Sequence, residues 1–306
     1  MGFVPQPAAM ANRIPLLVLQ VGLVFAWSSA YLGAVLASET GSIIRVILWR
    51  FTLVSLLFLP FLVMTLRRGV TWRWCLVQAV LGAVGMFGSV GLGIEAINLG
   101  LPAGTASLIA ALQPLATAVV AGPILGERVL RMQWIGLLIG VVGVTFSVGA
   151  LTGSDQLLGY VCSFASMVCM VVATLYAKAK WDGGELPAAI AMQTIVTALM
   201  FLPIALYNDT IWPQFSLPFL GAIAWAIVFS TLGGYGLYYV CLTRSGAVRT
   251  TSLIYITPGL TLVWAWAMFG QPMSPYTWIG LLLCLVGVYL ARGERTAAPR
   301  LSTEEI

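Results

Sequence analysis

Ten long apolar stretches constrain this chain more than any other feature of its sequence. Each holds about 20 mostly apolar residues, the length that an α-helix needs to cross the hydrocarbon core of a bilayer. The connections between them are too short to form a soluble domain. We therefore predict ten transmembrane helices, over residues 14–37, 43–66, 73–94, 102–124, 132–150, 157–177, 187–206, 216–240, 247–269 and 275–292.

The composition agrees with a polytopic membrane protein and excludes several other classes. Only 8% of the 306 residues are charged and none is histidine, whereas a soluble domain carries about 25% charged residues. A soluble enzyme, a disordered protein and a disulfide-stapled secreted module are therefore excluded. The five cysteines lie in apolar runs without C-x-x-C spacing, so neither a disulfide framework, a metal site nor a cofactor is expected. The apolar runs lack the alternation of barrel strands, which leaves an all-α membrane protein.

The distribution of charge predicts the orientation in the membrane. With the N-terminus inside, the outer connections carry Glu39, Glu95, Asp155 and Asp209. Thirteen of the 15 Lys and Arg residues fall in the inner segments: Arg13, Arg67, Arg68, Arg73, Arg128, Arg131, Lys178, Lys180, Arg244, Arg249, Arg292, Arg295 and Arg300. By the positive-inside rule, both termini are predicted to be cytoplasmic. The basic loops are explained by this rule, so no nucleic-acid partner is expected.

The two halves of the chain share a motif at a nearly constant offset. Ser-Leu-Ile at 107–109 leads to Pro114 and then to a Trp-Ile-Gly…Gly-Val block at 134–144. The same order recurs from Ser252 through Pro258 to residues 278–288. The offset is 145 residues at the serines and 144 from the prolines onward. A constant offset over several motifs indicates an internal duplication rather than convergent composition.

Each copy of the repeat contains five predicted spans, which is an odd number. The second copy must therefore enter the membrane from the opposite side, as in the inverted-topology repeats typical of secondary transporters. We predict a cytoplasmic segment at 1–13, a first five-helix repeat at 14–150, a second, inverted five-helix repeat at 151–293 and a cytoplasmic tail at 294–306.

These motifs resemble the drug/metabolite transporter superfamily, specifically its EamA-type ten-helix members. The resemblance is carried by the two five-span repeats and by four stretches: Arg50-Phe51, the run from Ala106-Ser-Leu through Pro114, Gly126-Glu127-Arg128, and Gln133-Trp-Ile-Gly136 with Gly143-Val144. It covers about residues 14–292, although Gln271-Pro272 replaces the Glu127-Arg128 pair in the second half. Among its members the chain is most similar to bacterial aromatic amino-acid exporters of the YddG type. The resemblance implies a multi-pass inner-membrane transporter without enzymatic activity, acting as a monomer or weak oligomer.

Aromatic and small polar residues within the spans are candidates for a substrate cavity. Stacking and a few hydrogen bonds would suit an aromatic or amphipathic solute. The alternative for any single Tyr or Trp is anchoring at the membrane interface, and this alternative stays open. The candidates are Trp27, Ser28, Tyr31, Met86, Ser89, Gln113, Tyr176, Tyr235, Tyr239 and Tyr255.

Prolines and glycines at matching positions of the two halves are candidates for gating. Pro114 and Pro258 lie within spans, where a proline frees the carbonyl four residues earlier. In a bilayer such a carbonyl is tolerated where protein or a water-filled cavity satisfies it. Gly88 and Gly233 also occupy matching positions, and small residues let helices approach closely. The alternative is that all four serve packing alone.

One charge, that of Arg50, is predicted to be buried inside the membrane. A charge at that depth is functional by default, but Arg50 could instead bond freed carbonyls at the repeat interface. No carboxylate is placed centrally, which disfavours a proton-coupled exporter of cations. A sugar-phosphate exchanger would require several buried cations.

The sequence therefore favours a facilitative, alternating-access exporter of neutral or zwitterionic metabolites, above all aromatic or hydrophobic amino acids. The alternatives are a proton-coupled drug exporter, a sugar-phosphate or nucleotide-sugar exchanger, and a non-transporting membrane interaction module. A membrane-embedded enzyme is disfavoured because neither a histidine nor an acid pair is present.

Overall fold

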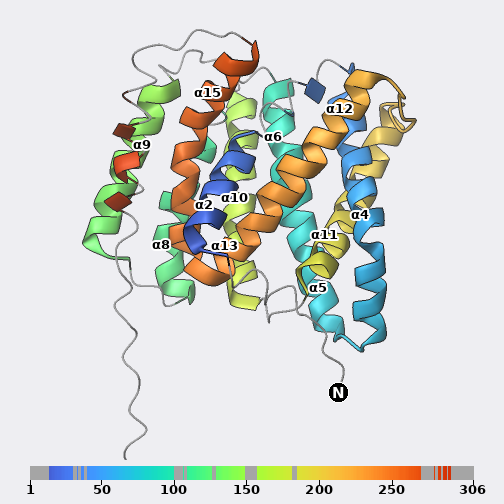
Figure 1. Ribbon diagram of the computed structural model, residues 1–306, viewed down its shortest axis with the longest axis horizontal. Helices are drawn as coiled ribbons and strands as arrows, with labels where there is room; N and C mark the ends of the chain where they lie inside the picture. The colour runs from blue at the N-terminus through green and yellow to red at the C-terminus, as the bar shows by residue number, and fades with distance from the viewer. Residues whose placement is uncertain are drawn as a thin grey trace, which may run out of the picture.

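The protein is a bundle of long apolar helices, seen side-on in Figure 1. The computed structural model describes residues 14–29, 33, 36–37, 40–99, 106, 109–125, 129–148, 157–180 and 185–269, with 279, 282–283, 285–287 and 289–290. These residues contain no strand. The helices are α2 (Leu16–Ser28), α4 (Ile43–Arg67), α5 (Trp72–Val80), η1 (Leu81–Gly88), α6 (Ser89–Asn98), α8 (Gln113–Leu125), α9 (Arg131–Val148), α10 (Leu157–Lys180), α11 (Leu186–Tyr207), α12 (Leu217–Trp225), η2 (Ala226–Gly236), α13 (Leu237–Ser245), α14 (Ala247–Ser252), η3 (Leu253–Ile256) and α15 (Thr257–Phe269).

Six stretches of the described chain are long and apolar enough to cross a membrane. They are Ile43–Arg67, Trp72–Asn98, Leu157–Lys180, Leu186–Tyr207, Leu217–Ser245 and Ala247–Met268. Each coincides with a predicted span to within a few residues. α2 and α9 supply further apolar helices. The prediction at 275–292 falls mostly outside the described residues.

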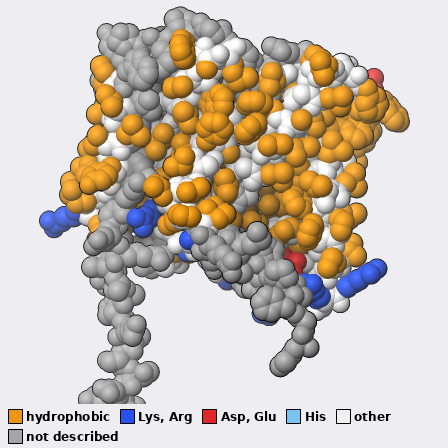
Figure 2. Space-filling view, viewed as in Figure 1, with side chains coloured by type: hydrophobic (Ala, Val, Ile, Leu, Met, Phe, Trp, Pro, Cys, Tyr) orange, Lys and Arg blue, Asp and Glu red, His pale blue; other side chains and the backbone are white. Residues whose placement is uncertain are grey.

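The outer surface of the bundle is apolar, as a lipid-facing surface requires. Leu17, Leu56, Phe164 and Leu199 are each more than half exposed. Figure 2 shows hydrophobic side chains over most of one face, with Lys and Arg gathered along its lower edge. In water these side chains would be costly to expose, whereas the hydrocarbon core of a bilayer accommodates them.

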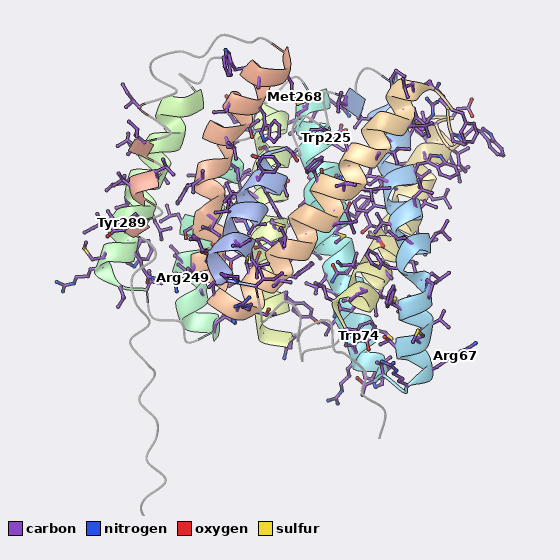
Figure 3. All side chains as sticks on the ribbon, in the orientation of Figure 1. Arg67, Trp74, Trp225, Arg249, Met268 and Tyr289 are labelled. Atoms are coloured by element: carbon purple, nitrogen blue, oxygen red, sulfur yellow. The ribbon has the colours of Figure 1, made fainter. Side chains whose placement is uncertain are left out.

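The basic side chains lie where several helix ends meet, and we call this the basic end of the bundle. Arg68, just after α4, pairs with Glu185 at the start of α11. Lys178 of α10 donates to the Leu242 carbonyl of α13 at 3.3 Å, and Arg244 donates to the carbonyl of Ile14 at 3.0 Å. In Figure 3, Arg67 and Arg249 lie toward this end, whereas Met268 and Trp225 lie toward the opposite end.

Helices from the two halves of the chain interlock rather than forming separate bundles. α4 packs along α11, and α8 packs against α14. α10 packs against η1 and α6, while α2 packs against η2 and α13. The main hydrophobic cluster therefore draws residues from both halves, among them Leu23, Phe51, Met170 and Tyr238.

Two helices contain π-helical segments, which the sequence analysis does not foresee. η1 and η2 begin at Leu81 and Ala226, which are 145 residues apart, the same offset that separates the repeated serines. π-Helical turns are rare and frequently mark functional sites. Both segments therefore point to the region between them as a place to look for function.

Three predicted spans are not single continuous α-helices where the structure describes them, and side chains bond carbonyls at two of these places. α2 ends at Ser28, short of the predicted 14–37 span, and Trp225 Nε1 donates to the Ser29 carbonyl at 3.1 Å. In the predicted span 102–124, a turn at residues 111–112 precedes α8. In the ninth span, η3 precedes α15, and Thr257 Oγ1 donates to the Ile254 carbonyl at 2.7 Å. That carbonyl is the one that Pro258 frees.

Candidate functional site

A cavity of about 290 Å³ lies between the two halves of the chain. This volume is near the lower end of the range for small-molecule sites. Its lining is mostly apolar: Trp27, Gly33, Ala37, Ile43, Val46, Ile47, Arg50, Ser89, Val90, Gly93, Ile94, Ile97, Ala106, Ala110, Ala111, Gln113, Ser163, Ser166, Met167, Met170, Ala226, Ser230, Gly234, Tyr235, Ile254 and Thr257. Residues of η2 and of all three discontinuous spans contribute to it, and η1 ends at Gly88, just before the lining residue Ser89.

The cavity runs from the middle of the bundle toward the end opposite the basic end. α4 contributes Ile43 through Arg50, its first turns, while Arg67 at its other terminus lies at the basic end. α6 contributes Ser89 through Ile97, close to its C-terminus. Arg50 is therefore about 10 Å along α4 from the helix start, at 1.5 Å per residue.

Arg50 is the charged group of the cavity. Its side chain is 8% exposed, and its Nε donates to Thr231 Oγ1 of η2 at 2.8 Å. The guanidinium carbon lies 4.7 Å from the ring centroid of Phe51. The described lining residues include no Asp or Glu, so this positive charge has no counterion there.

Tyr235 links the two π-helical segments at the cavity wall. Its hydroxyl donates to the Gly85 carbonyl of η1 at 3.3 Å, and Ser89 Oγ donates to the same carbonyl at 2.6 Å. Ser166 of α10 in turn donates to the Ser89 carbonyl at 2.6 Å. Side chains from η2, α6 and α10 therefore converge on one wall of the cavity.

A buried polar cluster closes the cavity on the side of the basic end. Gln113 Nε2 donates to the Tyr238 hydroxyl at 3.3 Å and lies 3.5 Å from Thr174 Oγ1. Tyr238 and Thr174 also share a short hydrogen bond, and Thr174 donates to the Met170 carbonyl at 2.7 Å. The Trp27 ring packs on Tyr238 with centroids 5.1 Å apart. We call Trp27, Gln113, Thr174 and Tyr238 the floor cluster.

The structure brings five of the predicted site residues together at the cavity: Trp27, Arg50, Ser89, Gln113 and Tyr235. The rings of Trp27 of α2 and Tyr235 of η2 pack at a tilt of 56°, with centroids 5.6 Å apart. Arg50 lines the cavity and also joins α4 to η2 through its bond to Thr231.

Other predicted residues lie outside the lining. Met86 is fully buried in the core because it sits in η1, where i→i+5 bonding widens the turn and residues three apart no longer share a face. Tyr239 is buried with its ring edge-on to Tyr238, at 6.0 Å. Ser28 is also buried, donates to the Phe25 carbonyl at 2.8 Å and receives a bond from Trp264 Nε1 at 3.2 Å.

The remaining tyrosines have different placements. Tyr255 is fully buried, and its ring lies so close to Gly140 that a Cβ there would be 2.5 Å from the ring. Tyr176 is half-buried and packs on the main core, two residues before Lys178 and thus near the basic end. Tyr31 lies outside the described residues.

The candidate gating residues are close in sequence to residues that line the cavity. Pro114 is buried in the first turn of α8, after Ala110 and Ala111, which do line the cavity. Pro258 lies in α15, just after the lining residue Thr257, and its side chain is outside the described part. Gly233 faces Ala26 of α2, where an added Cβ would be 2.7 Å from the Ala26 Cβ, and Gly88 similarly faces Cys169 of α10. These glycines allow close helix approach around the site.

Sequence reasoning missed the residues that act through the hydrogen-bond network. Thr231, Thr174 and Tyr238 are each almost fully buried, and each bonds to a predicted site residue. A second buried polar pair joins Gln193 of α11 to Gln78 of α5, with Nε2 to Oε1 at 2.7 Å. The signal available was a polar side chain within an apolar span, but its partner could not be read from spacing.

Comparison with known proteins identifies the family. The profile of the EamA-like transporter family matches residues 14–149 and again residues 157–293. The chain belongs to the EamA-like transporter family. It is similar to the uncharacterized inner membrane transporter YedA of Escherichia coli K12, with 23% identity over 94% of this chain and 95% of YedA.

Two further likenesses complete the comparison. The chain is 22% identical to the "Probable amino-acid metabolite efflux pump" of Salmonella typhimurium, over 67% of this chain and 72% of the pump. A solved crystal structure superposes with a TM-score of 0.74 at 20% identity, over 90% of this chain and 96% of the other. That structure supports the fold alone. The family match makes this protein a membrane transporter of small molecules rather than an enzyme.

Proposed function

We propose that this protein is an alternating-access carrier that exports neutral or zwitterionic metabolites, with aromatic and hydrophobic amino acids as its substrates. The observation that carries the proposal is the cavity itself, which is largely apolar, of about 290 Å³, and bordered by Trp27, Tyr235 and one arginine. Apolar and aromatic walls bind the side chain of such a solute, and a few polar groups orient its backbone atoms.

The size and charge of the cavity favour this substrate class over the alternatives. A nucleotide sugar is too large for this volume, and a sugar phosphate calls for more than the single guanidinium of Arg50. A cationic drug calls for a buried acid, yet the described lining contains none, and Glu95 lies exposed near the end of α6. The same feature supports facilitative transport, driven by the gradient of the solute.

The packing of the two halves supports an inverted repeat as the basis of alternating access. α4 and α11 are the second spans of their halves, and α8 and α14 belong to the fourth, so each packs against its counterpart. The contact of α10 with η1 is matched by that of α2 with η2. A two-fold axis in the membrane plane relates such pairs, and rocking one repeat against the other then exposes the site to each side in turn.

The basic end supports the proposed orientation in the membrane. If it faces the cytoplasm of the bacterial inner membrane, both termini are cytoplasmic, and the cavity runs toward the outside. The floor cluster then separates the cavity from the cytoplasm. Export requires the opposite state as well, in which Tyr238 leaves Gln113 and Thr174.

The relatives give this proposal limited support. One of them is named as an amino-acid metabolite efflux pump, while YedA carries no substrate in its name. Because both identities are below 25%, the substrate proposal rests mainly on the cavity. A non-transporting interaction module is disfavoured, because the family match covers both halves and the cavity lies between them.

Counterflow in proteoliposomes tests the proposal. Vesicles loaded with unlabelled phenylalanine should accumulate external labelled phenylalanine, with saturation, and competition by tryptophan and methionine. Glucose 6-phosphate and a cationic dye should not compete. Flux should persist after the pH gradient is collapsed. The absence of saturable amino-acid flux would refute the substrate class, and strict dependence on a pH gradient that Glu95→Gln abolishes would replace facilitative with proton-coupled transport.

A further inference from the structure

We propose that Arg50, held by Thr231, binds the carboxylate of the transported solute, and that the cavity has no corresponding site for an ammonium group. The ligand class is then hydrophobic monocarboxylates, of which amino acids are one case and their deaminated analogues another. This inference rests on the proposed function for its site, and it goes further by assigning which group of the solute is recognised.

The geometry leaves the carboxylate-binding face of Arg50 available. Arg50 Nε donates a hydrogen bond to Thr231 Oγ1 at 2.8 Å, and Phe51 covers one side of the guanidinium. Nη1 and Nη2 have no hydrogen-bond partner among the described residues, and Arg50 lines the cavity. Two such terminal nitrogens form the fork that binds a carboxylate in a bidentate manner.

The charge balance of the cavity favours an anion. Arg50 brings one positive charge into a mostly apolar space, and the described lining supplies no acid to balance it. A carboxylate neutralises that charge in a region of low dielectric, where an unpaired charge is costly. A cationic amine meets hydroxyls, carbonyls and the rings of Trp27 and Tyr235 there but no carboxylate among the described lining residues, and it is repelled by Arg50.

The neighbours of Arg50 define where the rest of the solute lies. Ile47 is one turn earlier on α4, and Tyr235 lies one turn after Thr231 on η2. Trp27 packs on Tyr235 at 5.6 Å between centroids. A carboxylate on Arg50 therefore places an attached hydrophobic group among aromatic and aliphatic walls.

A purely structural role would use Arg50 differently. Joining α4 to η2 requires only the Nε bond to Thr231, in which no ligand takes part. The structural role therefore predicts a loss of stability without a change in selectivity. Ligand selectivity is the property that separates the two roles.

The test compares three ligands that share one ring: L-phenylalanine, 3-phenylpropionate, which lacks the amine, and 2-phenylethylamine, which lacks the carboxylate. Each is measured as a competitor of labelled phenylalanine counterflow, and also by its effect on the melting temperature of the purified protein in detergent. The second readout requires no transport. We expect phenylalanine and 3-phenylpropionate to bind comparably and 2-phenylethylamine at least tenfold more weakly.

Variants assign this selectivity to Arg50. Arg50→Gln should weaken the binding of phenylalanine and of 3-phenylpropionate by roughly ten- to hundredfold, as expected for charge-assisted hydrogen bonds. Both ligands should then bind no more tightly than 2-phenylethylamine. Arg50→Lys keeps the positive charge but lacks the two terminal nitrogens that bind a carboxylate together, so its affinity for these ligands should lie between those of the native protein and of Arg50→Gln. Arg45→Gln is the matched control, because it makes the same change on α4 outside the lining, and it should preserve the selectivity.

The outcomes separate this inference from the proposed function. Saturable phenylalanine flux with equal competition by 2-phenylethylamine, or unchanged selectivity in Arg50→Gln, overturns the carboxylate site and leaves the transport proposal standing. If 3-phenylpropionate raises the melting temperature in an Arg50-dependent way but phenylalanine flux is absent, the carboxylate site stands and the proposed transport function is overturned. If Arg50→Gln does not fold, the three-ligand comparison on the native protein still decides, since equal binding of all three overturns the inference.

Discussion

Gly82→Ala tests the close approach between the two halves of the bundle. An added Cβ on Gly82 of η1 would lie 2.5 Å from the Gln193 carbonyl oxygen and 2.9 Å from the Gln193 Cα of α11. Ordinary contacts of this kind are 3.4–4 Å, so η1 and α11 must separate by about 1 Å. Both obstructing atoms are backbone, and no side-chain rotation can relieve the clash.

The expected loss of stability follows from the contacts between η1 and α11 that this separation disrupts. Overpacking of a close contact costs about 1–3 kcal/mol. The bond from Thr197 Oγ1 to the Gly82 carbonyl, 3.1 Å long, would lengthen as well, and such a bond within a membrane contributes about 0.6 kcal/mol. Together these give a loss of about 2–4 kcal/mol in the free energy of unfolding, or roughly 5–10 °C in the melting temperature.

Thermal unfolding in detergent, followed by tryptophan fluorescence at a fixed scan rate, measures this loss. Gly221→Ala in α12 is the matched control, because its Cβ would meet nothing within 4 Å, and it should melt at or slightly above the native temperature. If Gly82→Ala had the same melting temperature as Gly221→Ala, the inferred close packing of η1 on α11 would be wrong.

Three further predictions address the gate, the helix interruption and the surface. Tyr238→Phe removes the hydroxyl that bonds Gln113 and Thr174. We therefore expect Ser166→Cys, in a background without other cysteines, to react faster with an impermeant thiol reagent from the cytoplasmic side; unchanged labelling would argue against the floor cluster as a gate. Thr257→Val leaves the buried Ile254 carbonyl without its 2.7 Å bond and should cost about 1–3 kcal/mol in thermal unfolding, whereas Thr243→Val, at an exposed hydroxyl, should be nearly silent. Glu185→Gln breaks a solvent-exposed pair with Arg68 and should change stability by less than about 1 kcal/mol, so a larger loss would show that this pair is not screened.

Much of the architecture could be predicted because the bilayer imposes a simple rule on the sequence. A helix that crosses the membrane must be apolar over a fixed length, so stretches such as 43–66 and 187–206 could be located directly. The repeated motifs around Pro114 and Pro258 likewise marked where helices are interrupted. The match of the family profile to both halves confirms the membership that these motifs indicated.

Helix faces were harder to predict than helix positions. Sequence reasoning assumed α-helical spacing, which grouped Met86 with Ser89 and Tyr235 with Tyr239. Met86 lies in η1, whose wider turn moves it off the face of Ser89, so Ser89 lines the cavity while Met86 is packed in the core. Tyr235 lines the cavity from the end of η2, whereas Tyr239 lies in α13 and is packed in the core. Local spacing cannot reveal a π-helical turn, because tertiary contacts stabilise it.

The sequence by itself determined the class of protein, the positions of most helices and the identity of one buried charge. These follow from hydropathy and charge, which are local properties of the chain. Only the tertiary structure decided that Arg50 meets Thr231 from η2, that Tyr235 reaches Gly85 of η1, and that Tyr238 closes the floor with Gln113 and Thr174. Each of these contacts joins residues more than 60 positions apart, and their geometry depends on how the helices of the two halves pack together.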